Sequence, residues 1–259
     1  MNSPISYFGG KSRLAKRIVP MIPDHTCYCE PFCGAAWILF KKEPSTTEVI
    51  NDLDGELVNF WRVIQNHLQP FLEYFKYAIV SRKLFELENR KDPSTLTDLQ
   101  RAVRYYYLQR LGFGGKTSGR TFGAGAQRPT NLNLLTLEES LLETHWRLQR
   151  VTIENLDACK CIEKYDRKDT FFYIDPPYYH VSQDYFRPFE DADFMRLYDA
   201  SKAIKGRFIL SLNDHADIRK MFKAFHQIKI ATKYSSGNSR TCSVTRSKDR
   251  FELLIHNLP

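Results

Sequence analysis

The sequence predicts an α/β protein with a Rossmann-like, mostly parallel sheet of seven strands that helices cover on both faces. Strand and helix patterns alternate from residue 150 to the end of the sequence. A short segment at 26–32 runs into a turn of small residues and then a helix, as in nucleotide-binding folds. Residues 54–149 are mainly helical and interrupt the alternation. We therefore expect a sheet domain formed by 1–53 and 150–259, with 54–149 as an inserted subdomain.

The N-terminal elements follow one another closely. Residues 26–32 have the pattern of a strand, 33–36 form a turn, and 37–42 begin a helix. Residues 48–51 are a second strand, which Asp52 closes. Because the turn is built from small residues, a ligand can approach its backbone closely beside a helix N-terminus.

The inserted part contains a helical stretch and a Gly-rich loop. Residues 54–111 predict several helices, because apolar residues recur at spacings of three and four, with breaks at Pro70 and Pro93. Six of the twelve glycines then fall between 112 and 125. This Gly-rich loop, 112–133, is too long for an ordinary connection and is therefore expected to be functional. A helix at 137–149 leads back to the sheet.

The C-terminal part supplies the remaining strands. They are expected at 151–154, 170–174, 207–212, 225–231 and 250–256, with helices at 158–164, 191–203 and 215–222 between the earlier ones. The last strand follows a polar loop, so it can pair antiparallel with the strand before it.

Composition is ordinary for a soluble globular protein: 42% of the 259 residues are hydrophobic and 26% are charged. No run of eighteen apolar residues and no signal-peptide pattern occur, so we expect a cytoplasmic protein. The cysteine pairs Cys27-x-Cys29 and Cys159-x-Cys161 lack the usual zinc-site spacing, so we expect reduced thiols and no metal.

The charge distribution indicates a nucleic-acid partner. The net charge is +8, and residues 101–128 contain six basic side chains, five aromatic side chains and no acid. Residues 233–250 contain five basic side chains and one acid. Basic blocks with interleaved aromatic rings are typical of surfaces that bind phosphates and stack on bases.

The tetrad Asp175-Pro176-Pro177-Tyr178 is the most informative motif, because it follows an apolar strand at the sheet edge where ligands bind in open α/β folds. The two prolines stiffen the turn and contribute no N–H donors. A carboxylate, a bare carbonyl and an aromatic ring together suit a planar group that carries an –NH2.

Two further patterns bear on the cofactor. Asp52 lies 22 residues after Glu30, similar to the spacing of the acid that binds a ribose in dinucleotide folds. The turn lacks the G-x-G-x-x-G pattern, which argues against a nicotinamide cofactor. Gly9-Gly10-Lys11-Ser12 is not a P-loop, because Ile5 replaces the required glycine.

With these motifs in view, the chain resembles the Dam family of DNA adenine methyltransferases. The resemblance covers most of the chain, in the order that the family shows. The matching segments are Tyr7-Phe-Gly-Gly-Lys11, Glu30-Pro-Phe-Cys-Gly34, Asn51-Asp52, Asn155-Leu-Asp157, Asp175-Pro-Pro-Tyr178 and Phe251-Glu-Leu-Leu-Ile-His-Asn257.

The resemblance implies transfer of a methyl group from S-adenosylmethionine to the exocyclic amine of an adenine flipped out of double-stranded DNA. It implies that Asp175, Pro176 and Tyr178 are catalytic. The cofactor residues it implies are Tyr7, Lys11, Glu30, Phe32, Gly34, Asp52, Asp157 and Asp175. For DNA binding we expect residues of the two basic blocks: Arg110, Phe113, Lys116, Arg120, Arg128, Arg240 and Arg246. A monomer or weak dimer in a bacterial or phage-infected cell is expected.

Departures from the family pattern are local. Ala35-Ala36 stand where many relatives have two glycines, and the segment 109–116 matches the family's recognition segment only loosely. The target sequence, GATC or another, is therefore left open. Two alternatives remain: an RNA adenine methyltransferase, and a nucleic-acid-binding protein without catalysis.

Overall fold

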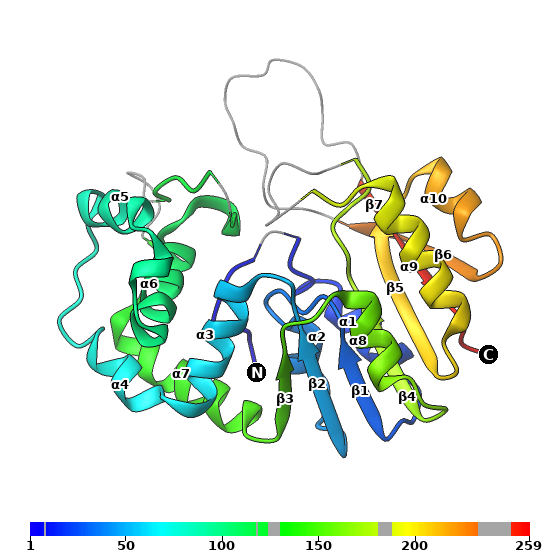
Figure 1. Ribbon diagram of the computed structural model, residues 1–259, viewed down its shortest axis with the longest axis horizontal. Helices are drawn as coiled ribbons and strands as arrows, with labels where there is room; N and C mark the ends of the chain where they lie inside the picture. The colour runs from blue at the N-terminus through cyan, green and yellow to red at the C-terminus, as the bar shows by residue number, and fades with distance from the viewer. Residues whose placement is uncertain (8, 118, 124–129, 181–187, 233–249) are drawn as a thin grey trace.

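A single seven-stranded sheet organises the computed structural model, which describes residues 1–7, 9–117, 119–123, 130–180, 188–232 and 250–259 (Figure 1). The strands, in sheet order, are β3 (Val151–Glu154), β2 (Thr47–Asn51), β1 (Cys27–Glu30), β4 (Thr170–Ile174), β5 (Arg207–Asn213), β7 (Arg250–His256) and β6 (His226–Thr232). Neighbours from β3 to β5 are parallel, whereas β7 runs antiparallel to both β5 and β6.

The predicted fold class is confirmed, and each predicted strand occurs within a few residues of its expected place. The first strand ends at Glu30 rather than at Phe32, and Pro31, which has no N–H to donate, follows it directly. The last strand does pair with β6, as expected. It also inserts between β5 and β6, which the sequence pattern did not indicate.

The helices also follow the predicted alternation. Between the strands lie α2 (Trp37–Lys41), α3 (Gly55–Asn66), α4 (Leu68–Glu73), α5 (Arg82–Arg90), α6 (Asp98–Leu111), α7 (Leu134–Leu148), α8 (Ala158–Tyr165), α9 (Asp191–Ala203) and α10 (Ala216–Met221). The sequence analysis missed α1 (Ala15–Ile18) and the 3-10 turn η1 (Val19–Met21). Helix α7 starts earlier than expected, because the Asn133 side chain accepts a bond from Leu135 N and caps it.

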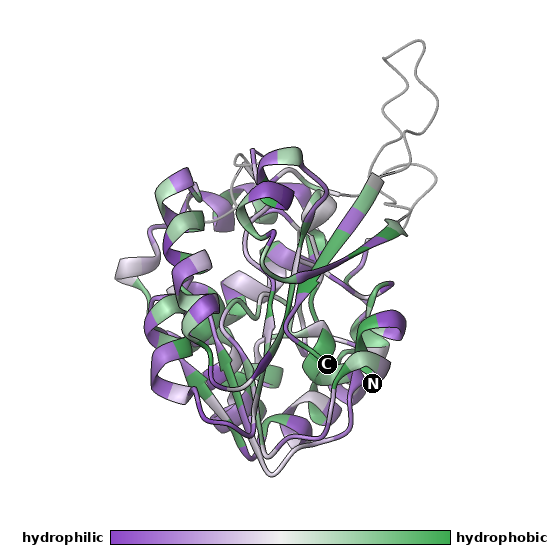
Figure 2. Ribbon diagram, turned by 90° about the vertical axis from the view of Figure 1, so that its right-hand side faces the viewer, coloured by the Kyte–Doolittle hydropathy of each residue, from purple (hydrophilic) through white to green (hydrophobic). Residues whose placement is uncertain are grey.

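Alternating strand side chains fill two cores on opposite faces of the sheet. Phe171 and Tyr173 belong to the core shared with α1, α2 and α3. Phe172 and Ile174 belong to the core shared with α8, α9 and α10. Figure 2 shows the hydrophobic colour concentrated in the strands, with hydrophilic segments along the outer helices. All five residues of β4 are buried, as expected for a central parallel strand that is covered on both faces.

The helical stretch between β2 and β3 lies to one side of the sheet, with α4, α5, α6 and α7 grouped together (Figure 1). Helix α3 joins this group to the sheet: its Phe60 and Trp61 are buried, and Phe60 stacks on Tyr106 of α6 at a centroid distance of 5.6 Å. Because the same apolar core continues from these helices onto the sheet, the division into a sheet domain and an inserted subdomain stays a prediction.

Two further findings concern the described residues alone. No helix among them is long and apolar enough to cross a membrane. Within the same residues, no group of His, Cys, Asp and Glu side chains is arranged to hold a metal ion. Cys29 and Cys161 are buried with their Sγ atoms 3.7 Å apart, and both are free thiols.

Gly206, directly before β5, offers a test of this packing. A Cβ atom there would lie 2.2 Å from the Thr170 carbonyl oxygen and 2.7 Å from that of Arg167. We expect Gly206→Ala to lower the free energy of unfolding by roughly 1–3 kcal/mol, because the strand ends must move apart. Denaturant or thermal unfolding measures this.

Gly55, at the start of α3, is the matched control for that substitution. A Cβ atom there would meet nothing nearer than Asn155 Oδ1 at 3.8 Å. Gly55→Ala is therefore expected to stabilise by roughly 0.4–1 kcal/mol. Equal losses in the two variants would contradict the close approach at Gly206.

Candidate active site

A cavity opens where the carboxyl ends of β1, β2 and β4 meet, the edge at which α/β folds bind ligands. It brings together, from separate parts of the chain, every residue that the sequence analysis assigned to the cofactor: Tyr7, Lys11, Glu30, Phe32, Gly34, Asp52, Asp157 and Asp175. Pro176 also lines it. Tyr178 is not one of the lining residues, and its hydroxyl accepts from Lys11 Nζ at 3.1 Å.

Asn51, the last residue of β2, is hydrogen-bonded to the turns after β1 and β3 at this edge. Its side-chain nitrogen donates to the Pro31 carbonyl (2.8 Å) and to the Leu156 carbonyl (3.0 Å). Its side-chain oxygen accepts from Leu156 N at 2.7 Å. Because all of these bonds are buried or partly buried, they fix the turns after β1 and β3 relative to β2.

The turn after β1 requires left-handed backbone at Gly34, where φ is +46°. Its N–H donates to Asp52 Oδ2 at 2.9 Å, and its carbonyl accepts from Trp61 Nε1 at 3.2 Å. A Cβ atom at Gly34 would lie 3.0 Å from the ring of Tyr7. Ala36 also has a positive φ of 50°.

Asp52 is held in place by backbone donors. Besides Gly34, Asp54 N donates to its Oδ1 at 3.0 Å. Burial raises the pKa of the Asp52 carboxyl to about 6, against the opposing effect of these bonds. The carboxylate is therefore ionised near neutral pH, with its position set by β2 and the turn.

The Glu30 side chain is hydrogen-bonded to groups of β1 and α2 next to the cavity. It is buried, and its Oε1 accepts from Tyr28 OH and from Leu39 N, both at 2.7 Å. Burial raises the pKa of Glu30 to about 8, so the carboxyl is largely protonated at pH 7. It lines the cavity as expected, and it also ties α2 to β1.

Asp157 caps α8 on the opposite side of the cavity. Its Oδ1 accepts from Cys159 N at 3.1 Å and Lys160 N at 3.3 Å. The guanidinium of Arg196, on α9, donates to the same oxygen at 2.9 Å. Arg196 was not expected from the sequence, where an arginine on a polar helix face carries no signal.

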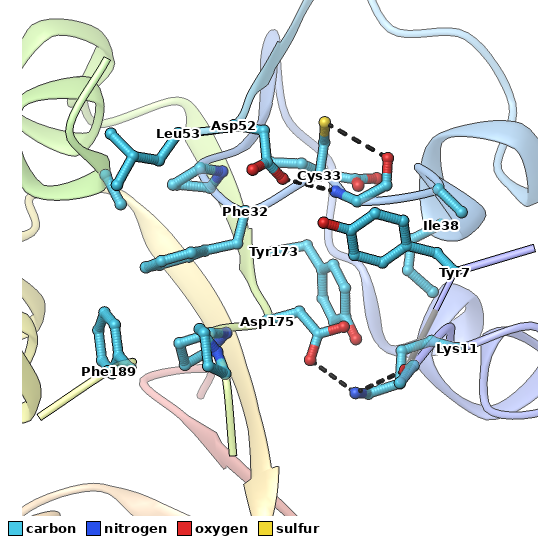
Figure 3. A pocket seen from close by; sticks show the side chains of 18 of the residues that line it. Tyr7, Lys11, Phe32, Cys33, Ile38, Asp52, Leu53, Tyr173, Asp175 and Phe189 are labelled. Atoms are coloured by element: carbon cyan, nitrogen blue, oxygen red, sulfur yellow. Dashed lines mark hydrogen bonds and ion pairs between the residues drawn. The ribbon is translucent and has the colours of Figure 1, made fainter. Parts of the chain in front are cut away.

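A cluster of charges surrounds Asp175. Lys11, whose surface is only 4% exposed, places Nζ 2.6 Å from Asp175 Oδ1 and 3.3 Å from Glu252 Oε1. Figure 3 shows Lys11 and Asp175 pointing toward each other beside Tyr173. Lys11 Nζ also donates to Tyr178 OH at 3.1 Å, and Tyr178 OH donates to Glu252 Oε2 at 2.6 Å.

Asp175 has a perturbed acidity in this cluster. Burial raises its pKa to about 6, the neighbouring Lys11 ammonium opposes that rise, and the Glu252 carboxylate adds to it. The Pro176 carbonyl, next in the chain, accepts no hydrogen bond from the described residues. Asp175 and Pro176 both line the cavity directly after β4.

Several residues of the site were missed by sequence reasoning. They are Trp37, Ile38, Tyr173, Phe189, Arg196 and Glu252. Glu252 alone carried a signal, as an acid inside the apolar strand 251–255. The aromatic residues Phe32 and Phe189 meet edge to face at 5.8 Å between ring centroids, and both line the cavity (Figure 3).

The expected DNA-binding residues fall into two groups. Arg128, Arg240 and Arg246 lie outside the described residues. Arg110 donates to the Pro4 carbonyl at 3.2 Å and to the Asn131 carbonyl, so its guanidinium lies against the N-terminal segment.

The remaining expected DNA-binding residues surround the start of the Gly-rich loop. Phe113 is 53% exposed. Arg120 lies 5.5 Å from the ring centroid of Tyr105 and donates to the Lys116 carbonyl at 3.1 Å. Whether these side chains contact DNA stays a prediction.

Comparison with known proteins agrees with this arrangement. The family model of the D12 class N6 adenine-specific DNA methyltransferases matches residues 7–236. Type II methyltransferase M.CviBI of a Paramecium bursaria Chlorella virus is 26% identical over 245 residues, which cover 90% of this chain and 91% of that protein. Type II methyltransferase M1.LlaDCHI of Lactococcus lactis is 26% identical over 250 residues, covering 88% and 87%.

A DNA adenine methylase of Haemophilus influenzae is 22% identical over 197 residues, covering 70% of this chain and 65% of that protein. The family match extends over nearly all of the chain and includes Asp175 and the whole cavity edge. The chain therefore belongs to the D12 class of N6 adenine-specific DNA methyltransferases.

Proposed function

We propose that the protein transfers a methyl group from S-adenosylmethionine to the exocyclic amine of an adenine in double-stranded DNA. The observation that carries this proposal is the acceptor pair of Asp175 and Pro176 at the cavity edge, with Lys11 paired to the carboxylate. The family match supports DNA as substrate over the alternative of RNA. The intact charge cluster argues against a protein without catalysis.

The walls of the cavity fit the proposed cofactor. Carboxylates at Asp52 and Asp157 suit hydroxyl and amino groups, and the rings of Phe32 and Phe189 suit a flat base. The turn at Gly34 allows close approach to backbone. When bound, S-adenosylmethionine would supply an activated methyl group.

The protein would act on the amine by position and charge. The lone pair of an aromatic amine is delocalised into its ring. The Asp175 carboxylate and the Pro176 carbonyl would accept the two amine hydrogens, which favours a tetrahedral nitrogen with a directed lone pair. Asp175 need not take a proton first, because the amine becomes acidic only once it is methylated.

Access to this site requires that the base leave the duplex, at a cost of a few kcal/mol. Tyr178 would stack on the extruded base, with its hydroxyl held by Lys11 and Glu252. The basic blocks at 101–128 and 233–250 would contact phosphates and bases. We infer a monomer or weak dimer that acts in the cytoplasm of a bacterial or phage-infected cell, and two of the relatives are bacterial or viral.

Asp175→Ala tests the assignment. Without the carboxylate, the amine loses its charged acceptor, so methyl transfer to duplex DNA should fall by about 100-fold or more. DNA binding, measured by gel shift, should remain. Asp199→Ala, which replaces an exposed aspartate on α9, is the control and should stay active.

Sequencing the methylated adenines of the DNA product identifies the target sequence. RNA is tested as a parallel substrate, and transfer to RNA alone would refute the proposal.

The pH dependence of methyl transfer is expected to follow the ionisation of the Asp175 carboxyl. Its raised pKa of about 6 means that it is an acceptor above that pH and protonated below it. The kcat for methyl transfer should therefore fall as the pH drops through about 6. Since the Lys11 ammonium lowers the pKa of Asp175, Lys11→Gln should move this acid limb to higher pH. An identical limb in both proteins would rule out the carboxylate as the titrating group.

Asp52→Ala addresses the cofactor side of the cavity. The substitution removes a carboxylate from the cavity wall. Gly34 N, which donates to this carboxylate at 2.9 Å, loses its acceptor. KM for S-adenosylmethionine should rise roughly tenfold, the loss of one good hydrogen bond to a charged group. The kcat should change less. Asp24→Ala, exposed before β1, serves as the reference, and an unchanged KM in Asp52→Ala would argue against cofactor contact.

A further inference from the structure

Glu252, on β7 between β5 and the edge strand β6, takes part in the charge cluster although it does not line the cavity. Building on the proposed function, we propose that Glu252 is a positioning residue for methyl transfer. It holds Tyr178 and Lys11 in place beside Asp175, and its charge leaves the buried cluster net negative.

The Glu252 side chain is buried and hydrogen-bonded at both carboxylate oxygens. Glu252 is 1% exposed. Its Oε2 accepts from Tyr178 OH at 2.6 Å, and its Oε1 accepts from Ser211 Oγ of β5. Lys11 Nζ lies 3.3 Å from the same Oε1. Both carboxylate oxygens are thus engaged by groups from three different elements.

The backbone beneath Glu252 is also fixed. Because β7 lies between two antiparallel neighbours, Glu252 is paired with Asn213 of β5 and with Ile230 of β6. This pairing fixes the backbone of Glu252, and burial together with bonds to both carboxylate oxygens restricts its side chain. Glu252 therefore sets the positions of Lys11 and Tyr178 rather than adapting to them.

The cluster around Asp175 contains two carboxylates and one ammonium group. Lys11 and Asp175 form a pair at 2.6 Å that is neutral by itself. Glu252 adds a second carboxylate, so the ionised cluster carries one net negative charge. Positive charge develops on the amine nitrogen as the methyl group is transferred, and a net negative cluster beside the acceptor favours that charge.

The groups that face Asp175 come from several elements. They are Lys11 from the N-terminal segment, Glu252 from β7, Tyr173 from β4 and Glu30 from β1. Tyr178 from the tetrad contacts Lys11. The Glu30 carboxyl is largely protonated at neutral pH, since burial raises its pKa to about 8. Glu252 is consequently the neighbour whose negative charge raises the pKa of Asp175 near neutral pH.

Glu252→Gln is the sharpest variant, because it keeps the size of the side chain and one of its two acceptor oxygens while it removes the charge. We expect kcat on duplex DNA to fall roughly 10- to 100-fold, since small displacements of reacting groups have effects of this size. KM for S-adenosylmethionine should stay within about twofold of wild type, because Glu252 does not line the cofactor cavity. The acid limb of the kcat profile should move to lower pH.

A second readout needs no cofactor. The pKa of Asp175 can be followed by carbon NMR of labelled aspartate in the free protein, with the Asp175 signal assigned from Asp175→Asn. It should be lower in Glu252→Gln than in wild type. A merely structural role for Glu252 would not move this value in the expected direction.

Glu48→Gln is the matched control. Glu48 is also a buried strand carboxylate, on β2, and it pairs with Lys42 and Arg147 away from the cavity. It should alter stability without moving the acid limb or the pKa of Asp175. Ser211→Ala keeps the charge of Glu252 while removing one of its hydrogen bonds, and should lower kcat without shifting the acid limb.

The outcomes separate the two proposals. Wild-type protein without activity on duplex DNA would refute the proposed function, and the inference with it. Active wild-type protein, with an unshifted Asp175 and an unchanged kcat in Glu252→Gln, would overturn the inference alone. If Glu252→Gln fails to fold, unchanged kcat in Ser211→Ala would overturn the positioning role, and a lowered kcat would support it.

Discussion

A buried ammonium group determines much of this structure. Lys11 is nearly inaccessible to water, and an unpaired charge in that position would be very costly. Carboxylates from β4 and β7 neutralise it, so the N-terminal segment must lie across the ends of both strands. The same requirement places Tyr178 beside Lys11 and turns the Asp175 carboxylate toward the cavity. The site therefore depends on an ion pair that also holds the fold together.

The helical stretch is coupled to that segment through backbone contacts. Gln109 donates to the Ser6 carbonyl at 2.8 Å and to the Gly115 carbonyl at 2.9 Å. Gly115 packs so closely that a Cβ atom there would lie 2.9 Å from the Tyr7 backbone. The segment that loosely resembles the family's recognition motif thus rests directly on the residues that precede Lys11.

The elements predicted correctly from the sequence are those that depend on interactions between residues close together in the chain. Strand β4 was predictable because its apolar run, its length and the Pro-Pro that follows are local signals. The missed helix α1 has four residues and no side-chain cap, so it depends on packing against neighbours. The place of β7 between β5 and β6 is a long-range choice, which the residues of the strand do not encode locally.

The sequence by itself determined the chemistry at each strand end: the acceptors of Asp175 and Pro176, the acid at Asp52 and the flexible turn at Gly34. These are properties of single residues and of short turns, so they can be read without knowing distant neighbours. Only the tertiary structure decided that Lys11 and Glu252 share one buried cluster with Asp175. Lys11, Asp175 and Glu252 are far apart in the chain and come together only in the folded protein. Their electrostatic attraction becomes strong there because folding removes water and lowers the local dielectric.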